Sequence, residues 1–142
     1  RRSGSIPQFI QDYHIDNGIL YGCVKHNIPF VLTGSIRDDG PLPEVYADAY
    51  QGAYAMRSLV RGATTVICLA TMLHTIAAGN MTPSFRVLPD GTVRPVYLYA
   101  VDADEFVVNK LRDRGSLCAT TMVTNVQDFI TKVARDLGVY PK

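Results

Sequence analysis

The stretch Thr64-Thr65-Val66-Ile67-Cys68-Leu69-Ala70 decides the fold of this chain, and Thr71-Met72-Leu73-His74 follows it directly. An apolar run of this length, rich in β-branched residues, is typical of a strand that is buried on both faces. The residues after it predict a helix that extends to Gly79. A buried strand followed at once by a helix is the repeating unit of a parallel α/β sheet.

The same unit recurs on both sides of this stretch. Further strands are predicted at residues 30–33, 96–101 and 119–124, and helices at residues 5–13, 16–27, 44–61, 104–114 and 126–137. Pro89-Asp90-Gly91 predicts the turn of a small hairpin before residue 96. The alternation predicts an α/β fold: a three-layer parallel sheet of four neighbouring strands, with helices on both faces, in one domain of residues 1–142.

The composition fits one folded domain. The chain has 142 residues, of which 47% are hydrophobic and 19% charged, and this balance excludes an intrinsically disordered chain. Fourteen Lys and Arg against thirteen Asp and Glu leave a net charge of +1, so we expect no nucleic-acid and no membrane partner. The longest uncharged run, residues 62–85, contains His74 and Asn80, which favours a buried strand and helix over a membrane span.

The cysteines and the first residues predict where the protein resides. Cys23, Cys68 and Cys118 are odd in number and widely spaced, which is typical of a reduced cytoplasmic protein and predicts no metal site. Cys68 and Cys118 have no basic neighbour in sequence that would lower a thiol pKa, so we expect both in the core. The chain begins without Met and without a signal peptide, and we expect it to be a C-terminal fragment of a longer chain.

Ligands of an open parallel sheet bind beyond the carboxyl ends of its strands, so the residues after each strand are the candidate site. The loop at residues 34–43 contains Asp38 and Asp39. It is either a solvated turn that caps the next helix or a loop whose carboxylates bind ribose hydroxyls or a substrate amine. Thr71 would offer a helix N-terminus to a phosphate. His74 is either a hydrogen-bonded core residue or a catalytic residue.

The two remaining junctions also carry polar side chains. Asp102 ends the strand at residues 96–101 and could bind an adenosine ribose, cap the helix that begins near Asp104, or do both. Asn125 precedes Val126 and could cap the last helix or contact a cofactor. Neither a GxGxxG turn nor a Walker-type phosphate loop occurs in the chain, so either the glycine-rich turn of a dinucleotide site lies upstream of Arg1 or the binder is of another type.

These junctions together resemble a known family. The eleven residues Thr33-Gly34-Ser35-Ile36-Arg37-Asp38-Asp39-Gly40-Pro41-Leu42-Pro43 are the most specific match, and Leu69-Ala70-Thr71-Met72-Leu73-His74, Ala78-Gly79-Asn80-Met81 and Asp113-Arg114-Gly115-Ser116 support it. From about Ser3 to about Leu137 the chain resembles the archaeal-type ornithine cyclodeaminases. This family is also known as the LOR/SDH conserved region, and it forms the C-terminal part of the arginine dihydrolase/ornithine cyclodeaminase.

The resemblance implies a Rossmann-like, deoxyhypusine-synthase-like sheet that binds NAD. The implied reaction converts L-ornithine to L-proline and ammonia, with NAD reduced and reoxidised within one turnover. A homo-oligomer is expected. The implied cofactor contacts are Asp39, Thr71, Met72, Leu73, His74, Asp102, Asn125 and Val126. The candidates for the catalytic base are Asp38, Asp39 and His74.

The chain departs from the family in two places, and other functions stay open. Asn125 stands where the family usually has Asp, and residues 82–96 form a longer connection than the usual one. One alternative is a module that senses or binds NAD or an amino acid without catalysis. The other is part of a lysine/saccharopine-type dehydrogenase, which would accumulate NADH as it oxidises its substrate.

Overall fold

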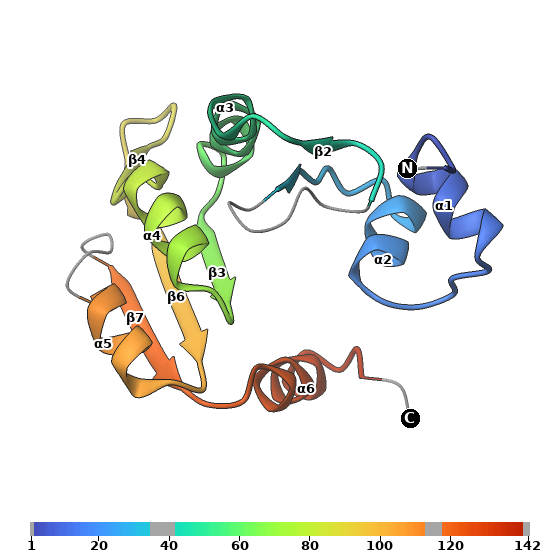
Figure 1. Cartoon of the computed structure of the whole chain (residues 1–142). Coiled ribbons are helices and arrows are strands. Elements are labelled where there is room, and N and C mark those ends of the chain that lie inside the picture. Colours follow the sequence, from blue (N-terminus) through green and yellow to red (C-terminus); the bar gives the residue numbers. More distant parts are fainter. Residues whose placement is uncertain (1, 35–41, 113–117, 141–142) are drawn as a thin grey trace. The chain divides into compact units, whose positions relative to one another are not determined.

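The computed structural model describes residues 2–34, 42–112 and 118–140. The chain forms two compact units, Arg1–Leu59 and Val60–Lys142. Each is built from the elements predicted above, with differences at particular residues (Figure 1).

The first unit begins with two short helices, α1 (Ile6–Asp12) and α2 (Ile19–Lys25). Ser5 caps α1, because its hydroxyl accepts the Gln8 N–H. The carboxylate of Glu44 accepts the N–H of Ile6 at 3.0 Å, so a residue 38 positions away satisfies another free donor of this helix.

Two corrections fall in this unit. The predicted strand at 30–33 contains only β1 (Leu32–Thr33), and β1 pairs in parallel with β2 (Val45–Tyr46) rather than with the three later strands. The helix predicted from residue 44 begins only at α3 (Ala49–Val60). It starts late because residues 45 and 46 are held in the β1–β2 pair, and because Asp48 accepts the Gln51 N–H at 2.8 Å in the manner of a helix cap.

The second unit contains the central sheet. Its strands are β3 (Thr65–Leu69), β6 (Tyr97–Asp102) and β7 (Ala119–Val123), in the order β3-β6-β7 and all parallel. The parallel arrangement predicted for these three strands is confirmed. The hairpin predicted around Pro89-Asp90-Gly91 is also confirmed, with β4 (Phe85–Val87) antiparallel to β5 (Val93–Pro95).

Two helices cover one face of this sheet. α4 (Met72–Met81) and α5 (Glu105–Arg112) contact each other, and α4 packs on β3 while α5 packs on β6 and β7 (Figure 1). The core of the unit lies beneath them. It is formed by alternate residues of the strand region, namely Val96, Leu98 and Ala100, each at most 1% exposed, and by Cys68 of β3.

The opposite face is covered mainly near the carboxyl end of the strands. There α6 (Val126–Asp136) contacts β6, and its side chains share a pocket with Met122 of β7. On the same face, but further from the carboxyl ends of the strands, Ile67 and Tyr97 remain about half exposed, at 49% and 46%. The expectation that the TTVICLA strand is buried on both faces is therefore wrong, since Thr65 and Ile67 are exposed on the face opposite α4. Helices do flank the sheet on both sides, but unequally.

Among the described residues, no helix is long and apolar enough to cross a membrane.

Candidate functional site

Three strand-to-helix junctions lie next to each other at the carboxyl edge of the β3-β6-β7 sheet. The Ala70 N–H donates to the Val101 carbonyl at 2.9 Å, and the Thr124 N–H donates to the Asp102 carbonyl at 2.9 Å. These bonds continue the pairing of the strands beyond their last residues. Side chains that follow β3, β6 and β7 are therefore brought to one edge, as the parallel topology requires.

The junction after β3 is a tight turn into α4. Ala70 has a positive φ of 53°, a conformation uncommon for a residue with a side chain, and the next residue is already the N-cap. The hydroxyl of Thr71 accepts the backbone N–H of His74 at 3.4 Å. This cap starts the helix immediately after the strand, so the N–H groups of Met72 and Leu73 face the edge without partners inside the helix.

The same hydroxyl also orients the imidazole of His74. Thr71 Oγ1 lies 3.1 Å from His74 Nδ1. A threonine hydroxyl has one proton to donate and two lone pairs to accept with, so it can pair with Nδ1 in either neutral tautomer of the ring while it accepts the backbone N–H. The ring of His74 is exposed, so the alternative that placed it in the core is wrong.

At the junction after β6, the carboxylates of Asp102 and Asp104 each accept a backbone N–H from the residue two positions further along the chain. Asp102 Oδ1 accepts the N–H of Asp104 at 2.9 Å, and Asp104 Oδ1 accepts the N–H of Phe106 at 2.8 Å. Asp104 therefore caps α5, whereas Asp102 holds the turn before it. Asp102 is partly exposed, and its second carboxylate oxygen remains available to a ligand.

The junction after β7 is capped by Asn125. Its side-chain oxygen accepts the N–H groups of Gln127 at 2.8 Å and Asp128 at 3.4 Å, which makes it the N-cap of α6. The amide NH₂ is then the remaining donor of this side chain, where an aspartate would have a second acceptor. Val126 is half-buried at the first position of the helix.

The remaining predicted site residues, Asp38 and Asp39, lie outside the described residues. The first loop therefore stays a sequence prediction. Within the described ranges, no three His, Cys, Asp or Glu side chains come close enough together to hold a metal ion.

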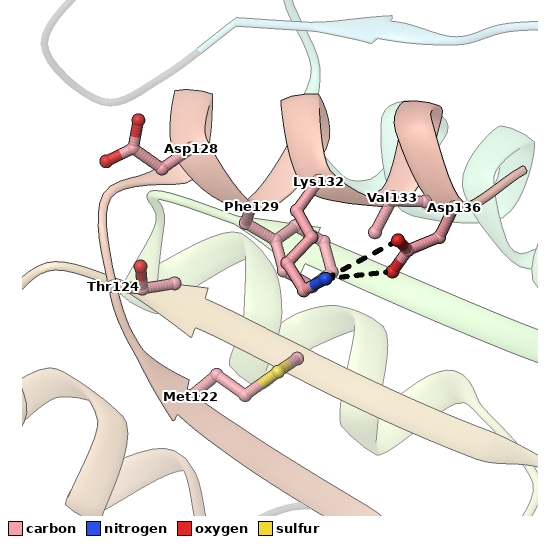
Figure 2. A pocket seen from close by; sticks show the side chains of 7 residues that line it. All are labelled: Met122, Thr124, Asp128, Phe129, Lys132, Val133 and Asp136. Atoms are coloured by element: carbon pink, nitrogen blue, oxygen red, sulfur yellow. Dashed lines mark hydrogen bonds and ion pairs between the residues drawn. The ribbon is translucent and has the colours of Figure 1, made fainter. Parts of the chain in front are cut away.

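A pocket of about 380 Å³ lies beside this edge, between the end of β7 and α6. Figure 2 shows the aromatic ring of Phe129 and the side chain of Val133 on α6, with Met122 on the strand and the Lys132–Asp136 ion pair near the helix end. The sequence did not predict a site here. The signal that could have indicated it is the apolar face of residues 126–137, because no residue of α6 is buried.

The cysteine beneath the edge is a packing residue. Cys68 is buried in β3, and desolvation raises the pKa of its thiol, while a side-chain hydrogen bond with Thr75 opposes part of this shift. A raised pKa keeps the thiol neutral and unreactive near neutral pH. The prediction of a core position is confirmed for Cys68, whereas Cys118 is only half-buried.

Comparison with known proteins identifies the family. Residues 1–133 match the family described as arginine dihydrolase ArgZ-like, C-terminal, Rossmann fold. The chain belongs to this family. It is 42% identical over 136 residues to ornithine cyclodeaminase of Methanocaldococcus jannaschii, and this alignment covers 96% of this chain and 30% of the relative. It is 41% identical over 137 residues to the bifunctional arginine dihydrolase/ornithine cyclodeaminase ArgZ of Synechocystis, covering 96% of this chain and 18% of the relative.

Solved structures agree with the sequence comparison. The chain matches a LOR/SDH protein of Methanococcus maripaludis with a TM-score of 0.82 and 37% identity, covering 96% of this chain and 38% of that one. It matches AgrE, solved as a ternary complex with ornithine and NAD⁺, with a TM-score of 0.79 and 40% identity, covering 97% of this chain and 19% of that one. The chain thus spans about a third or less of the curated relatives it matches.

Proposed function

We propose that this chain is the NAD-binding part of an ornithine cyclodeaminase, which converts L-ornithine to L-proline and ammonia. The observation that carries the proposal is the meeting of Thr71, Asp102 and Asn125 at one sheet edge, in a family member similar to a protein solved with ornithine and NAD⁺. We further propose that residues 1–142 act as one cytoplasmic NAD-binding domain of a longer, homo-oligomeric enzyme.

The residues at this edge fit a dinucleotide. The unpartnered N–H groups of Met72 and Leu73 at the start of α4 suit a phosphate, because the helix N-terminus carries partial positive charge. The free oxygen of Asp102 suits a ribose hydroxyl. Asn125 and Val126 would line the next junction, with the amide NH₂ as a donor, and Asp39 would complete the set from the loop at 34–43.

His74 is proposed to act as a hydrogen-bond donor toward a ligand oxygen. Its Nδ1 lies 3.1 Å from the Thr71 hydroxyl, which leaves Nε2 of this exposed residue for a ligand. The base for the substrate amine is proposed to be Asp38 or Asp39, with His74 as the alternative. NAD, when bound, would take a hydride from the amine-bearing carbon and return it to the cyclic imine formed after ammonia departs.

Titration of NAD into the chain tests the assignment of Asp102. Asp102→Asn should weaken NAD binding by about ten- to a hundredfold, because it removes a charged hydrogen-bond acceptor. Asp104→Asn is the matched control, since this carboxylate caps α5 and should leave NAD affinity unchanged. Equal affinities for the Asp102 variant and the unaltered chain, with the fold intact, would return Asp102 to a purely structural role.

The reaction is tested with ornithine and NAD by following proline, ammonia and the absorbance of NADH together. A cyclodeaminase produces proline and ammonia in equal amounts while NADH does not accumulate. Stoichiometric NADH would instead indicate a dehydrogenase, and NAD binding without any product would indicate a binding module.

A further inference from the structure

The backbone has an unusual conformation at two places that are not helix ends. Four non-glycine residues of the described ranges have a positive φ, namely His14, Asn27, Glu44 and Ala70. His14 and Asn27 each follow the end of a short helix, where a left-handed residue is common. Ala70 instead leads into the junction after β3, and Glu44, with a φ of 61°, follows the loop at residues 34–43. A left-handed residue with a side chain persists where its surroundings hold it, often beside a functional site.

Glu44 is held through its own side chain. Its carboxylate accepts the N–H of Ile6 at 3.0 Å, and Ile6 is fully buried. This N–H lies in the first turn of α1 and cannot be bonded within the helix. The next residue, Pro7, has no N–H, and the N–H of Gln8 is bonded by Ser5. Glu44 therefore satisfies a buried donor that would be costly to leave without an acceptor.

The start of the same loop is held by the β1–β2 pair. The N–H of Gly34 donates to the Tyr46 carbonyl at 3.0 Å, and Glu44 directly precedes β2. The pairing of β1 with β2 thus brings the two ends of the loop together. α3 lies closely on this pair at the buried Gly52, where a Cβ atom would come within 2.7 Å of Thr33 Cγ2. All these contacts lie within the first unit.

We propose that Glu44 is a positioning residue for the cofactor site, an inference that rests on the function proposed above. Its carboxylate ties the end of the loop at residues 34–43 to α1, while the β1–β2 pair fixes the start. Asp38 and Asp39 lie between these two ends in sequence, and the proposed function places a cofactor contact and the candidate base there. Because catalytic groups must be placed accurately, a contact that fixes the loop acts on the reaction without touching the ligands.

Steady-state kinetics of the intact enzyme with ornithine and NAD test the proposal. Glu44→Ala should lower kcat/KM by about ten- to a hundredfold, because misplacing a catalytic group by about 1 Å has effects of this size. Glu44→Gln should restore the activity, since its amide oxygen can still accept the N–H of Ile6. Each variant is assayed well below its unfolding temperature, so that loss of folded enzyme does not contribute.

Ser5→Ala is the matched control. It removes the other side-chain cap of α1 and leaves the loop at residues 34–43 untouched. Both Ser5→Ala and Glu44→Ala should lower the midpoint of thermal unfolding, since each removes a bond to the first turn of the same helix. Only Glu44→Ala should lower kcat/KM. A cap with a purely structural role would change the unfolding midpoint and not the kinetics.

Three results would overturn the proposal while the proposed function stands: a Glu44→Ala variant with unchanged kcat/KM, an equal loss in Ser5→Ala, or a Glu44→Gln variant as impaired as Glu44→Ala. An unaltered enzyme that binds no NAD and forms no proline would refute the proposed function, and the positioning role with it. If Glu44→Ala does not fold, Glu44→Gly tests the same contact, because glycine adopts the left-handed conformation without strain.

Discussion

The two faces of the β3-β6-β7 sheet are built from the same strands but have opposite environments. On one face Leu98 is 1% exposed beneath α4 and α5, whereas Tyr97, the adjacent residue on the other face, is 46% exposed. Both residues belong to one apolar run. The difference shows that an apolar strand predicts the presence of a sheet but not which of its faces is covered.

The largest expected difference between the faces is in stability. Leu98→Ala should lower the free energy of unfolding by about 3 kcal/mol, because it removes a fully buried side chain and leaves a cavity. Tyr97→Ala should cost about 1 kcal/mol or less, since half of this side chain is already in water. Urea unfolding followed by circular dichroism measures both values. Equal losses would contradict the contrast between the faces.

The helices on the two faces should differ in local opening. α4 contains buried residues, among them Thr75, Ala78 and Gly79, while α6 contains none. Amide hydrogens of α6 should therefore exchange at least about tenfold faster, relative to their intrinsic rates, than those of α4. Hydrogen exchange followed by mass spectrometry resolves the two helices. Protection of α6 equal to that of α4 would refute this expectation.

The cap of α4 connects the covered face to the candidate site. Thr71→Ala should lower the free energy of unfolding by about 1 kcal/mol through loss of the N-cap, and it should also free His74 Nδ1. Thr71→Ser keeps the hydroxyl and should preserve both properties. The measurements are thermal unfolding and NMR of the imidazole nitrogens, in which the Ala variant alone should show a changed tautomer balance. An unchanged balance would refute the proposed role of the hydroxyl.

The smallest expected effect is the pH dependence due to Cys68. Burial raises the pKa of this thiol in the folded state, so the folded protein holds the proton more tightly than the unfolded chain. Its contribution to stability is complete below the ordinary thiol pKa, near 9, and is lost as the pH rises through the folded value. As the pH rises from about 8 to about 10, the free energy of unfolding of Cys68→Val should therefore fall less than that of the unaltered chain. Parallel curves for the two proteins would contradict this.

Most local features of the second unit could be predicted from the sequence. The hairpin turn at Pro89-Asp90-Gly91 and the parallel strands β3, β6 and β7 follow from signals within a few residues of each other. Polar residues at strand ends indicated the sheet edge where Thr71, Asp102 and Asn125 meet. Such features can be predicted because turn chemistry, helix capping and the succession of strands and helices along the chain depend on residues that are near neighbours in sequence.

The tertiary structure alone decided the features that depend on distant neighbours. Val45 and Tyr46 were predicted as helical, but pairing with β1 holds them in a strand and Asp48 starts the helix after them. His74 is exposed, although most other residues of the helix that carries it are apolar.

The sequence by itself thus determined that the chain forms a parallel α/β sheet and which polar residues follow its strands. Only the tertiary structure decided that α4 and α5 cover one face of that sheet while Ile67 and Tyr97 stay half exposed on the other. The physical reason is that strand formation depends on local backbone preference and side-chain alternation, whereas burial depends on which element, distant in sequence, packs against each face.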